Sequence, residues 1–438
     1  MPKKGILLHL SHVNRDNETE PFELKIINTL SKFDYSIWQH LPLNPPGKYD
    51  SPYSALSTFA GDLTLMSEKI EIEKDKCAFE KWVKDNAFWI FDWAIFIVLK
   101  IKFNNREWFN WPDEFKFRDE TALEIFKKKN KEHLDGIINE QFLFEEKWQM
   151  VKKKANKSGI KLFGDLPFYV AMDSADVWAN PNLFELDNHL VPLKIAGVPP
   201  DYFSVEGQIW ENPIYDWKEH RLNKFKWWKD RIKVNEKRFD ILRIDHFRAI
   251  ISGWCIDYGS KNAISGHWKR GPGKALLDEI LTIMPSDRII AEDLGHITSS
   301  VKNLIKEYGL KGMRVLQFGY GDEKTNEHHH KNIGHNTVCY VGTHDNNTTK
   351  GWFKEMKFKE QTTSFKNLVK EFEMNESNCC KKMISIGMKT SSEYFVATIQ
   401  DIMNLDDKYR TNVPGRNENN WILSLNQKKI IESIKNEI

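Results

Sequence analysis

The sequence predicts an α/β fold of the (β/α)8 barrel type. Eight short strand-like runs recur along the 438 residues, and helical patterns lie between many of them. Most of these runs are apolar at both odd and even positions, as expected of strands buried on both faces. A plain barrel needs roughly 250 residues, so the surplus predicts insertions, which barrel enzymes place at the C-terminal face beside their active sites.

Each run is short and has the composition of a buried strand. In chain order the eight predicted strands are Gly5–Leu10, Ser36–Leu43, Ile160–Leu166, Phe239–Asp245, Arg288–Asp293, Met313–Phe318, Thr337–Gly342 and Tyr394–Gln400. A helical pattern over Ser300–Tyr308 separates the fifth run from the sixth. The most apolar stretch, Phe88–Phe103, contains Asp92 and Lys100 and is too short to span a bilayer, so it predicts a buried helix.

The extra residues fall mainly in two gaps. Residues 44–159 follow the second run, and residues 167–238 follow the third. No fixed repeat and no low-complexity linker separates one part of the chain from another. We therefore expect one catalytic barrel domain over residues 1–438, with 44–159 and 167–238 as insertion subdomains at the C-terminal face.

Composition excludes several classes of partner. The 64 basic and 62 acidic residues leave a net charge of +2, which gives no argument for nucleic acid or an acidic partner. The five cysteines have no C-x-x-C spacing and read as reduced thiols, and the apolar-leaning N-terminal stretch is short for a signal peptide, so a cytoplasmic protein is expected. We expect no membrane partner and a monomer or weak homodimer. The triplet His328–His330 lacks ligands at fixed offsets and predicts a loop, and no metal or cofactor is expected.

The fourth run ends in an unusual pair of charges. Arg243 and Asp245 are two residues apart on a predicted strand, so with Ile241 they share one face, whereas Leu242 and Ile244 point to a covering layer. A pair of this kind can be a structural ion pair. It can also belong to a site, because buried polar groups are costly unless they are hydrogen-bonded.

Two other strand ends are also acidic. Glu292 ends the fifth run within AEDLG, and Asp345 follows the seventh within GTHDNNTT. Taken singly, AEDLG could be a helix N-cap and THDN a turn. The carboxyl ends of barrel strands meet at one mouth, so Asp245, Glu292 and Asp345 are expected to converge there.

Three carboxylates in one pocket suit glycosidic-bond chemistry, which needs an ionised nucleophile and a protonated acid. We expect Arg243 to lower the pKa of Asp245 and keep it ionised. Glu292 has apolar neighbours, which predicts a raised pKa. His344 and Asp345 could hold a sugar ring in a distorted shape.

Long ordered segments resemble the 4-alpha-glucanotransferases, also called amylomaltases or disproportionating enzymes, of glycoside hydrolase family 77. The likeness covers nearly the whole chain. It is carried by Trp38–Asp62, Gly164–Asp187, Gly197–Trp217, Leu242–Arg248, Ile289–Gly295, Gly312–Tyr320, Val341–Trp352 and Arg410–Arg416. The resemblance implies a retaining enzyme that cuts an α-1,4-glucan and passes the chain to another sugar through a covalent glycosyl-enzyme.

Roles follow from the matching motifs. Asp245 matches the family's nucleophile, Glu292 its acid/base and Asp345 its third carboxylate. The residues expected to bind substrate are Ser51, Tyr53, Gln208, Trp210, Arg243, His246, His344 and Asn412. The GVPPDYF loop that begins at Gly197 overhangs the acceptor side in the family.

The chain departs from the family in two places. It reads GKYDSPY where the family usually reads GYGDSPY, so Lys48 replaces an aromatic residue and Tyr49 replaces a glycine. The opening HLSHV lacks the family's usual HPTSLP. The partners implied are α-1,4-glucans and maltooligosaccharides.

Three rival functions stay open on these residues. An α-glucan hydrolase would share the first half-reaction, and only the GVPPDYF loop favours transfer. An inactive glucan-binding scaffold would not need an acid beside a nucleophile. A phosphate-binding barrel enzyme would need a Gly-rich loop after the seventh or eighth strand, and none is present.

Overall fold

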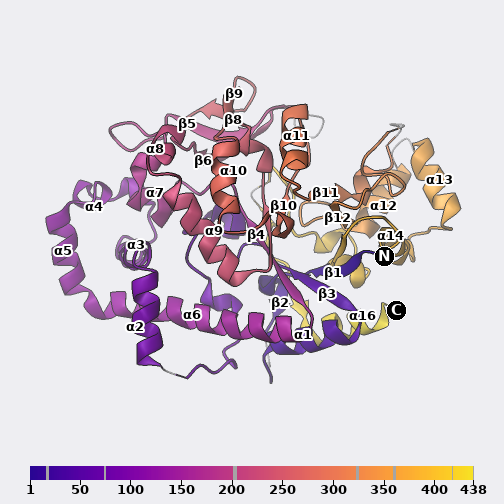
Figure 1. The fold of residues 1–438 in the computed structure, drawn as a ribbon, viewed down its shortest axis with the longest axis horizontal. Coiled ribbons are helices and arrows are strands. Elements are labelled where there is room, and N and C mark those ends of the chain that lie inside the picture. The colour runs from indigo at the N-terminus through magenta and orange to yellow at the C-terminus, as the bar shows by residue number, and fades with distance from the viewer. Residues whose placement is uncertain are drawn as a thin grey trace.

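All eight predicted strands are present in the structure, a computed structural model that describes residues 1–15, 19–73, 75–200, 205–321, 325–358, 362–416 and 418–437. Figure 1 shows the strands in the middle of the molecule with helices around them. They are β1 (Lys3–Leu7), β3 (Tyr35–Gln39), β4 (Lys161–Leu166), β7 (Ile241–Ile244), β10 (Ile289–Ala291), β11 (Gly312–Val315), β12 (Thr337–Tyr340) and β13 (Tyr394–Thr398). The observed strands are shorter than the predicted runs by one to three residues, and β11 and β13 pass directly into helical turns.

The strands form a nearly closed parallel barrel. Neighbours in space are neighbours in chain order, and β1 pairs with both β3 and β13. The two ends of the sheet, β10 and β11, meet through one parallel bridge between Ile290 and Lys311 and through a 2.8 Å hydrogen bond from the Ala291 N–H to the Lys311 carbonyl. The predicted (β/α)8 barrel is confirmed.

The barrel interior is filled by side chains from every strand. This apolar layer comprises Leu7, Ile37, Phe163, Ile241, Ile290, Met313, Val315, Val338, Tyr340, Tyr394 and Val396, with Leu41 beside them. Leu242 and Ile244, on the other face of β7, belong instead to the cluster that packs against the outer helices. The alternation predicted for this strand is therefore observed, and it turns Arg243 toward the barrel interior.

Helices cover the outside of the barrel. They are α1 (Phe22–Lys32), α6 (Lys131–Lys157), α9 (Lys226–Arg238), α10 (Lys274–Leu281), α11 (Ser299–Glu307), α12 (Thr349–Phe358), α13 (Thr363–Glu371), α14 (Cys379–Gly387), α15 (Ile399–Ile402) and α16 (Gln427–Asn436). Helix α11 is the one predicted between the fifth and sixth strands. Helix α9 packs on β4 and β7, with Trp228 and Ile232 fully buried. A short parallel pair, β2 (Val13–Asn14) and β14 (Leu425–Asn426), joins the two terminal segments.

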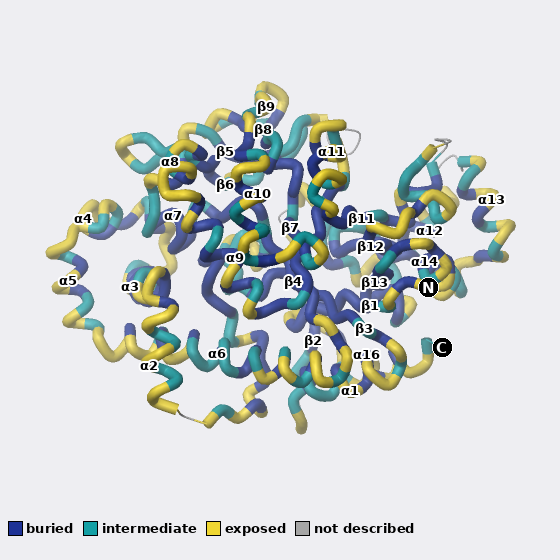
Figure 2. The backbone as a smooth tube through the Cα atoms, in the orientation of Figure 1, coloured by how far each residue is buried: buried dark blue, intermediate teal, exposed yellow. Residues whose placement is uncertain are grey.

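The segment between β3 and β4 is largely helical. It adds α2 (Lys76–Asp85), α3 (Ile90–Lys102), α4 (Asp113–Lys116) and α5 (Glu120–Lys129), which lie to the left of the barrel in Figure 1. Helix α3 is the buried helix predicted from its apolar run. Figure 2 shows that α4 and α5 are mostly exposed, whereas the barrel strands are buried.

The segment after β4 contributes to a second sheet. It contains α7 (Ala175–Ala179), β5 (Lys194–Val198), β6 (Gln208–Pro213) and α8 (Trp217–Leu222). β5 and β6 form a four-stranded antiparallel sheet with β8 (Ser252–Asp257) and β9 (His267–Arg270), which follow β7. The sequence analysis did not predict β8 and β9, because both are short and neither has a continuous apolar run.

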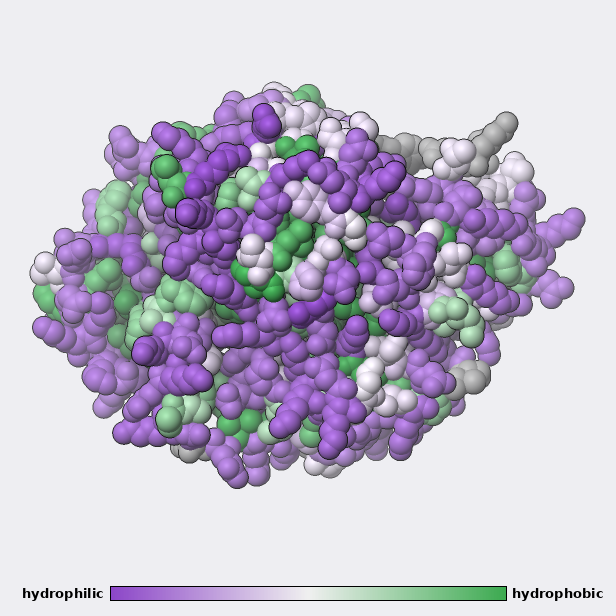
Figure 3. Space-filling model, viewed as in Figure 1, coloured by the Kyte–Doolittle hydropathy of each residue, from purple (hydrophilic) through white to green (hydrophobic). Residues whose placement is uncertain are grey.

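The surface is predominantly polar. Figure 3 shows a largely hydrophilic face on which hydrophobic residues are scattered. Over the described ranges, no helix combines the length and the apolar character that crossing a membrane requires.

Candidate active site

A buried arginine joins two strands at the C-terminal end of the barrel interior. Asp165 on β4 lies opposite Arg243 on β7 in the sheet register. One guanidinium nitrogen, Nη1, lies 2.8 and 2.6 Å from the two carboxylate oxygens of Asp165. Sequence reasoning missed Asp165, although an acid at the end of the third predicted strand was a usable signal.

Asp245 lies on the open side of the same arginine. The other guanidinium nitrogen, Nη2, is 2.7 Å from Asp245 Oδ1, and the Asp245 side chain is 28% exposed whereas that of Arg243 is 5% exposed. Arg243 therefore supports Asp245 from below and is shared between two carboxylates. The position of Arg243 below Asp245 leaves the Asp245 carboxylate accessible from the barrel mouth.

The expected low pKa of Asp245 is not observed. Burial raises the pKa of Asp245 to about 8, and the negative charges of Asp165, Glu292 and Asp345 act in the same direction, against the lowering effect of Arg243. The prediction was wrong because it considered the cation beside Asp245 but not the burial of the carboxylate, nor the charge of Asp165 on the same cation.

Glu292 lies beside this pair and is held by the backbone. Its two carboxylate oxygens accept hydrogen bonds from the N–H groups of His246, at 2.9 Å, and Leu294, at 2.8 Å. Burial raises the pKa of Glu292, as predicted, although Arg243 and the two N–H groups lower it. Burial therefore raises the pKa of both acids, and the negative charge of Glu292 adds to the rise at Asp245.

Asp345 is fixed by residues from the C-terminal segment. The side-chain amide of Asn412 donates to Asp345 Oδ1 at 2.6 Å, and Arg410 donates to the Asp345 carbonyl, also at 2.6 Å. His344 Nε2 lies 3.4 Å from Asp345 Oδ2, and the Asp345 side chain is 42% exposed. The structure thus brings His344, Asp345 and Asn412 together, as the motifs predicted.

An aromatic group lines this side of the site. The ring of Tyr53 stacks on His344 with centroids 5.1 Å apart and planes 12° apart, and its hydroxyl donates to Asp165 at 2.7 Å. Trp421 packs against both rings, at 5.8 Å from Tyr53 and 5.9 Å from His344. Its φ of 65° is unusual for a bulky residue, and such outliers cluster at functional sites. Trp421 was not predicted, although Asn419, with φ 59°, lies two residues before it and asparagine favours a left-handed backbone.

A second aromatic contact lies on the side of β6. Trp210 meets His246 edge-on with centroids 4.7 Å apart, and its indole N–H donates to Gln208 Oε1 at 3.2 Å. His246 itself has a left-handed backbone, with φ 49°. Burial lowers the pKa of His246 to about 3, so its ring is neutral at physiological pH.

Two features that were predicted to contact substrate, Ser51 and the GVPPDYF loop, are not seen beside the carboxylates in the described residues. Ser51 does not reach the carboxylates; its hydroxyl accepts the Tyr53 N–H at 3.3 Å and so shapes the turn that presents Tyr53. The GVPPDYF loop falls partly on residues 201–204, which lie outside the described residues. Lys48 replaces the family's usual aromatic residue and forms a 2.8 Å ion pair with Glu211. This ion pair links the segment that carries Tyr53 to β6.

Comparison with known proteins decides the family. The profile of the 4-alpha-glucanotransferases, glycoside hydrolase family 77, matches residues 64–428. The chain belongs to this family. It is therefore an enzyme that acts on α-1,4-glucans, as the resemblance implied.

Individual relatives are similar to this family member over nearly its whole length. The 4-alpha-glucanotransferase of Aquifex aeolicus is 34% identical over 461 residues, which cover 95% of this chain and 94% of the relative. That of Clostridium butyricum is 36% identical and covers 90% and 89% of the two chains. The amylomaltase of Streptococcus agalactiae, solved in complex with acarbose, superposes with a TM-score of 0.88 at 29% identity, over 100% of this chain and 98% of the other.

Asp165→Asn tests the sharing of Arg243. The amide keeps an acceptor for the Tyr53 hydroxyl but removes one of the charges that raise the pKa of Asp245. We expect the pH profile of kcat/KM to shift toward lower pH by about one unit. Asp176→Asn is the control, because Asp176 is equally buried but bonds to the Thr58 backbone N–H instead. An unmoved profile in Asp165→Asn would show that Asp165 does not tune the pair.

Proposed function

We propose that the protein is a retaining 4-alpha-glucanotransferase that moves α-1,4-glucan segments from a donor maltooligosaccharide to an acceptor sugar through a covalent bond to Asp245. The observation that carries this proposal is the position of Asp245, 2.7 Å from the shared cation of Arg243 and near the buried Glu292. Retaining chemistry requires an ionised nucleophile and a protonated acid. Arg243 favours the ionised form of Asp245, and burial favours the protonated form of Glu292.

The first step uses the pair in its reactive protonation state. Glu292 carries the proton, and Asp245 is ionised against Arg243. The bond between the sugar C1 and the leaving oxygen breaks as that oxygen takes the proton of Glu292, and a bond forms between C1 and a carboxylate oxygen of Asp245. The N–H groups of His246 and Leu294 then stabilise the carboxylate left on Glu292.

The second step reverses the first with a new oxygen. The ionised Glu292 takes the proton from an acceptor hydroxyl, whose oxygen attacks C1 and releases Asp245. Asp345 has exposed oxygens and fixed partners, and we propose that it, His344 and Asn412 bind hydroxyl groups of the donor sugar. The guanidinium nitrogens of Arg243 are bonded to Asp165 and Asp245. Arg243 therefore affects the reaction by holding Asp245, not by contacting the sugar.

The rim residues are assigned to sugar binding on both sides of the cleaved bond. Tyr53, presented by Ser51, borders the donor side through its stack with His344. Trp210, His246 and Gln208 border the side of β6, which we assign to the acceptor. We further propose that residues 1–438 form one catalytic domain in which 44–159 and 167–238 are insertion subdomains.

Incubation with maltotriose alone tests transfer against hydrolysis, since both share the first step. Water is present at tens of molar, and a positioned sugar hydroxyl can compete because effective concentrations reach about 10⁵ M in favourable cases. We expect glucose and a ladder of longer maltooligosaccharides, with little rise in reducing ends. If reducing ends climb in step with maltotriose consumption and no longer product forms, the protein is a hydrolase.

A further inference from the structure

A second cavity lies apart from the carboxylates. It has a volume of about 500 Å³ and is bordered by the loop that leads into β12 and by α13. It shares no lining residue with the site of Asp245. This volume falls within the roughly 300–1,000 Å³ typical of small-molecule pockets.

The base of the cavity is rigid and aromatic. Tyr320 is 1% exposed and Leu368 is 2% exposed. The Tyr320 hydroxyl lies 3.1 Å from His330 Nδ1, and the rings of His329 and His330 are 4.4 Å apart. Burial of the Tyr320 ring behind the histidines and its contact with Trp352 fix this wall before any ligand arrives.

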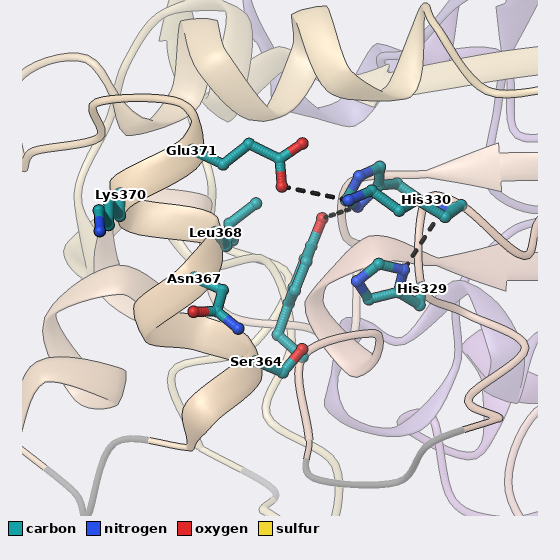
Figure 4. Close-up of a pocket in the computed structure, with 9 residues that line it drawn as sticks. His329, His330, Ser364, Asn367, Leu368, Lys370 and Glu371 are labelled. Atoms are coloured by element: carbon teal, nitrogen blue, oxygen red, sulfur yellow. Dashed lines mark hydrogen bonds and ion pairs between the residues drawn. The ribbon is translucent and has the colours of Figure 1, made fainter.

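The opposite wall carries open hydrogen-bonding groups. Figure 4 shows Ser364, Asn367 and Glu371 on α13 with the two histidines across from them. Among the described residues, neither the Ser364 hydroxyl nor the Asn367 amide has a protein hydrogen-bond partner. A hydroxyl and an amide can each donate and accept, so this wall suits a ligand that does both.

The charges of the lining disfavour an anion. Lys331 is paired with Glu371 at 3.3 Å, so an anion would face the Glu371 carboxylate. Lys370 points away from the histidines in Figure 4. Burial and the neighbouring charge of Lys331 lower the pKa of His329 and, to about 4, that of His330, so both rings are neutral. The described residues also provide no cluster of three ligating side chains for a metal ion.

We propose that this cavity is a second saccharide site that holds one or two glucose units of a glucan, separate from the site of cleavage. A neutral polyhydroxyl ligand matches the paired donors and acceptors of Ser364 and Asn367, and its apolar ring faces match the imidazole rings. The choice of a glucan as the ligand rests on the proposed function, because glucan chains are what the enzyme encounters.

The test uses histidine signals as local reporters. The Asp245→Asn protein, labelled with 13C-histidine, is titrated with maltotriose, and the signals of His330 and His344 are assigned by substitution to glutamine. We expect both signals to shift, each with its own affinity. Ser364→Ala with Asn367→Ala should weaken the affinity read at His330 about tenfold, from the loss of two hydrogen bonds, and leave that read at His344 unchanged.

The control is Lys366→Ala, an exposed change on the same helix that should alter neither affinity. If His344 responds and His330 does not, the second site is refuted and the proposed function stands. If His330 responds to inorganic phosphate and not to maltotriose, the cavity is an anion site and the proposal is wrong. If His330 responds while the wild-type protein transfers no glucan from maltotriose, the second site stands and the proposed function fails.

Discussion

We expect Asp245→Asn to lower the rate of transfer by about 10⁴-fold or more on every donor, the scale of loss seen when a group that acts directly in bond making is removed. The amide cannot form the bond to C1 that the proposed mechanism requires. Rates of glucose release and of chain lengthening from maltotriose measure this loss. Asp257→Asn is the control, because Asp257 is exposed and pairs with Lys194 on the antiparallel sheet.

Stability separates this loss from misfolding. The folded protein raises the pKa of Asp245 to about 8, which means that it holds the ionised carboxylate less favourably than the unfolded chain does. Asparagine removes that charge. We therefore expect the thermal midpoint of Asp245→Asn at pH 8 to equal or exceed that of the wild type.

Glu292→Gln distinguishes the acid from the nucleophile. Protonation by Glu292 matters when the leaving group is a sugar hydroxyl, so the rate on maltotriose should fall by about 10²–10⁴-fold. A donor with a good leaving group, such as a maltotriosyl fluoride, needs no proton and should keep much of its first step. If Asp245→Asn and Glu292→Gln lose both donors equally, the assignment of the acid to Glu292 is unsupported.

The barrel was predictable because its strands are apolar on both faces. Each of the eight runs was found near its expected place, since a strand covered by helices outside and by side chains inside is mostly apolar on both faces. The strands β8 and β9 were not predictable in this way. They have only six and four residues, and no residue of β9 is buried. β8 pairs with β5, which lies far back in the chain, and β9 pairs with β8.

The positions of the charged residues of the site were predictable from the sequence, but the pKa of Asp245 was not. Strand ends placed Asp245, Glu292 and Asp345 at one mouth, since parallel strands end together. The pKa of Asp245 depends instead on its burial and, in addition, on Asp165, whose approach to Arg243 follows from the register between β4 and β7. Register is set by packing over the whole barrel. The position of Trp421 likewise depends on its contacts with Tyr53 and His344, from distant parts of the chain.

Buried neutral histidines should make the fold sensitive to acid. Six histidines among the described residues are at most 9% exposed; they are His9, His12, His40, His220, His246 and His344. Burial lowers the pKa of His12, His40 and His246 to about 3 and that of His220 to about 4, and the pKa of His9 falls well below its usual range. These residues bind protons in the unfolded chain, with a pKa near 6.5, before they do so in the folded protein.

The direction of the stability change with pH follows from this difference between the folded and unfolded pKa values. The unfolded state binds more protons below pH 6.5, so stability falls as the pH drops from 6.5 toward 4. At pH 4.5 each histidine whose pKa falls to about 3 or 4 costs the folded state on the order of 2–3 kcal/mol relative to the unfolded chain. Asp176 and Asp401, with pKa values raised to about 6, and Asp245, at about 8, bind protons on the folded side and offset part of this cost.

Urea unfolding between pH 7 and pH 4.5 measures this loss of stability, against the roughly 5–15 kcal/mol that stabilises a domain. His40 provides the sharpest single test, because burial alone lowers its pKa and its ring packs between Trp38 and Trp148. His40→Gln should lower stability at pH 7 but remove about one proton from the uptake on unfolding near pH 5.5. His189→Gln, at an exposed turn, is the control for the substitution itself and should leave stability at pH 7 unchanged. If His40→Gln and the wild type lose stability in parallel down to pH 4.5, His40 is protonated in the folded protein. The buried histidines are then not the cause of acid unfolding.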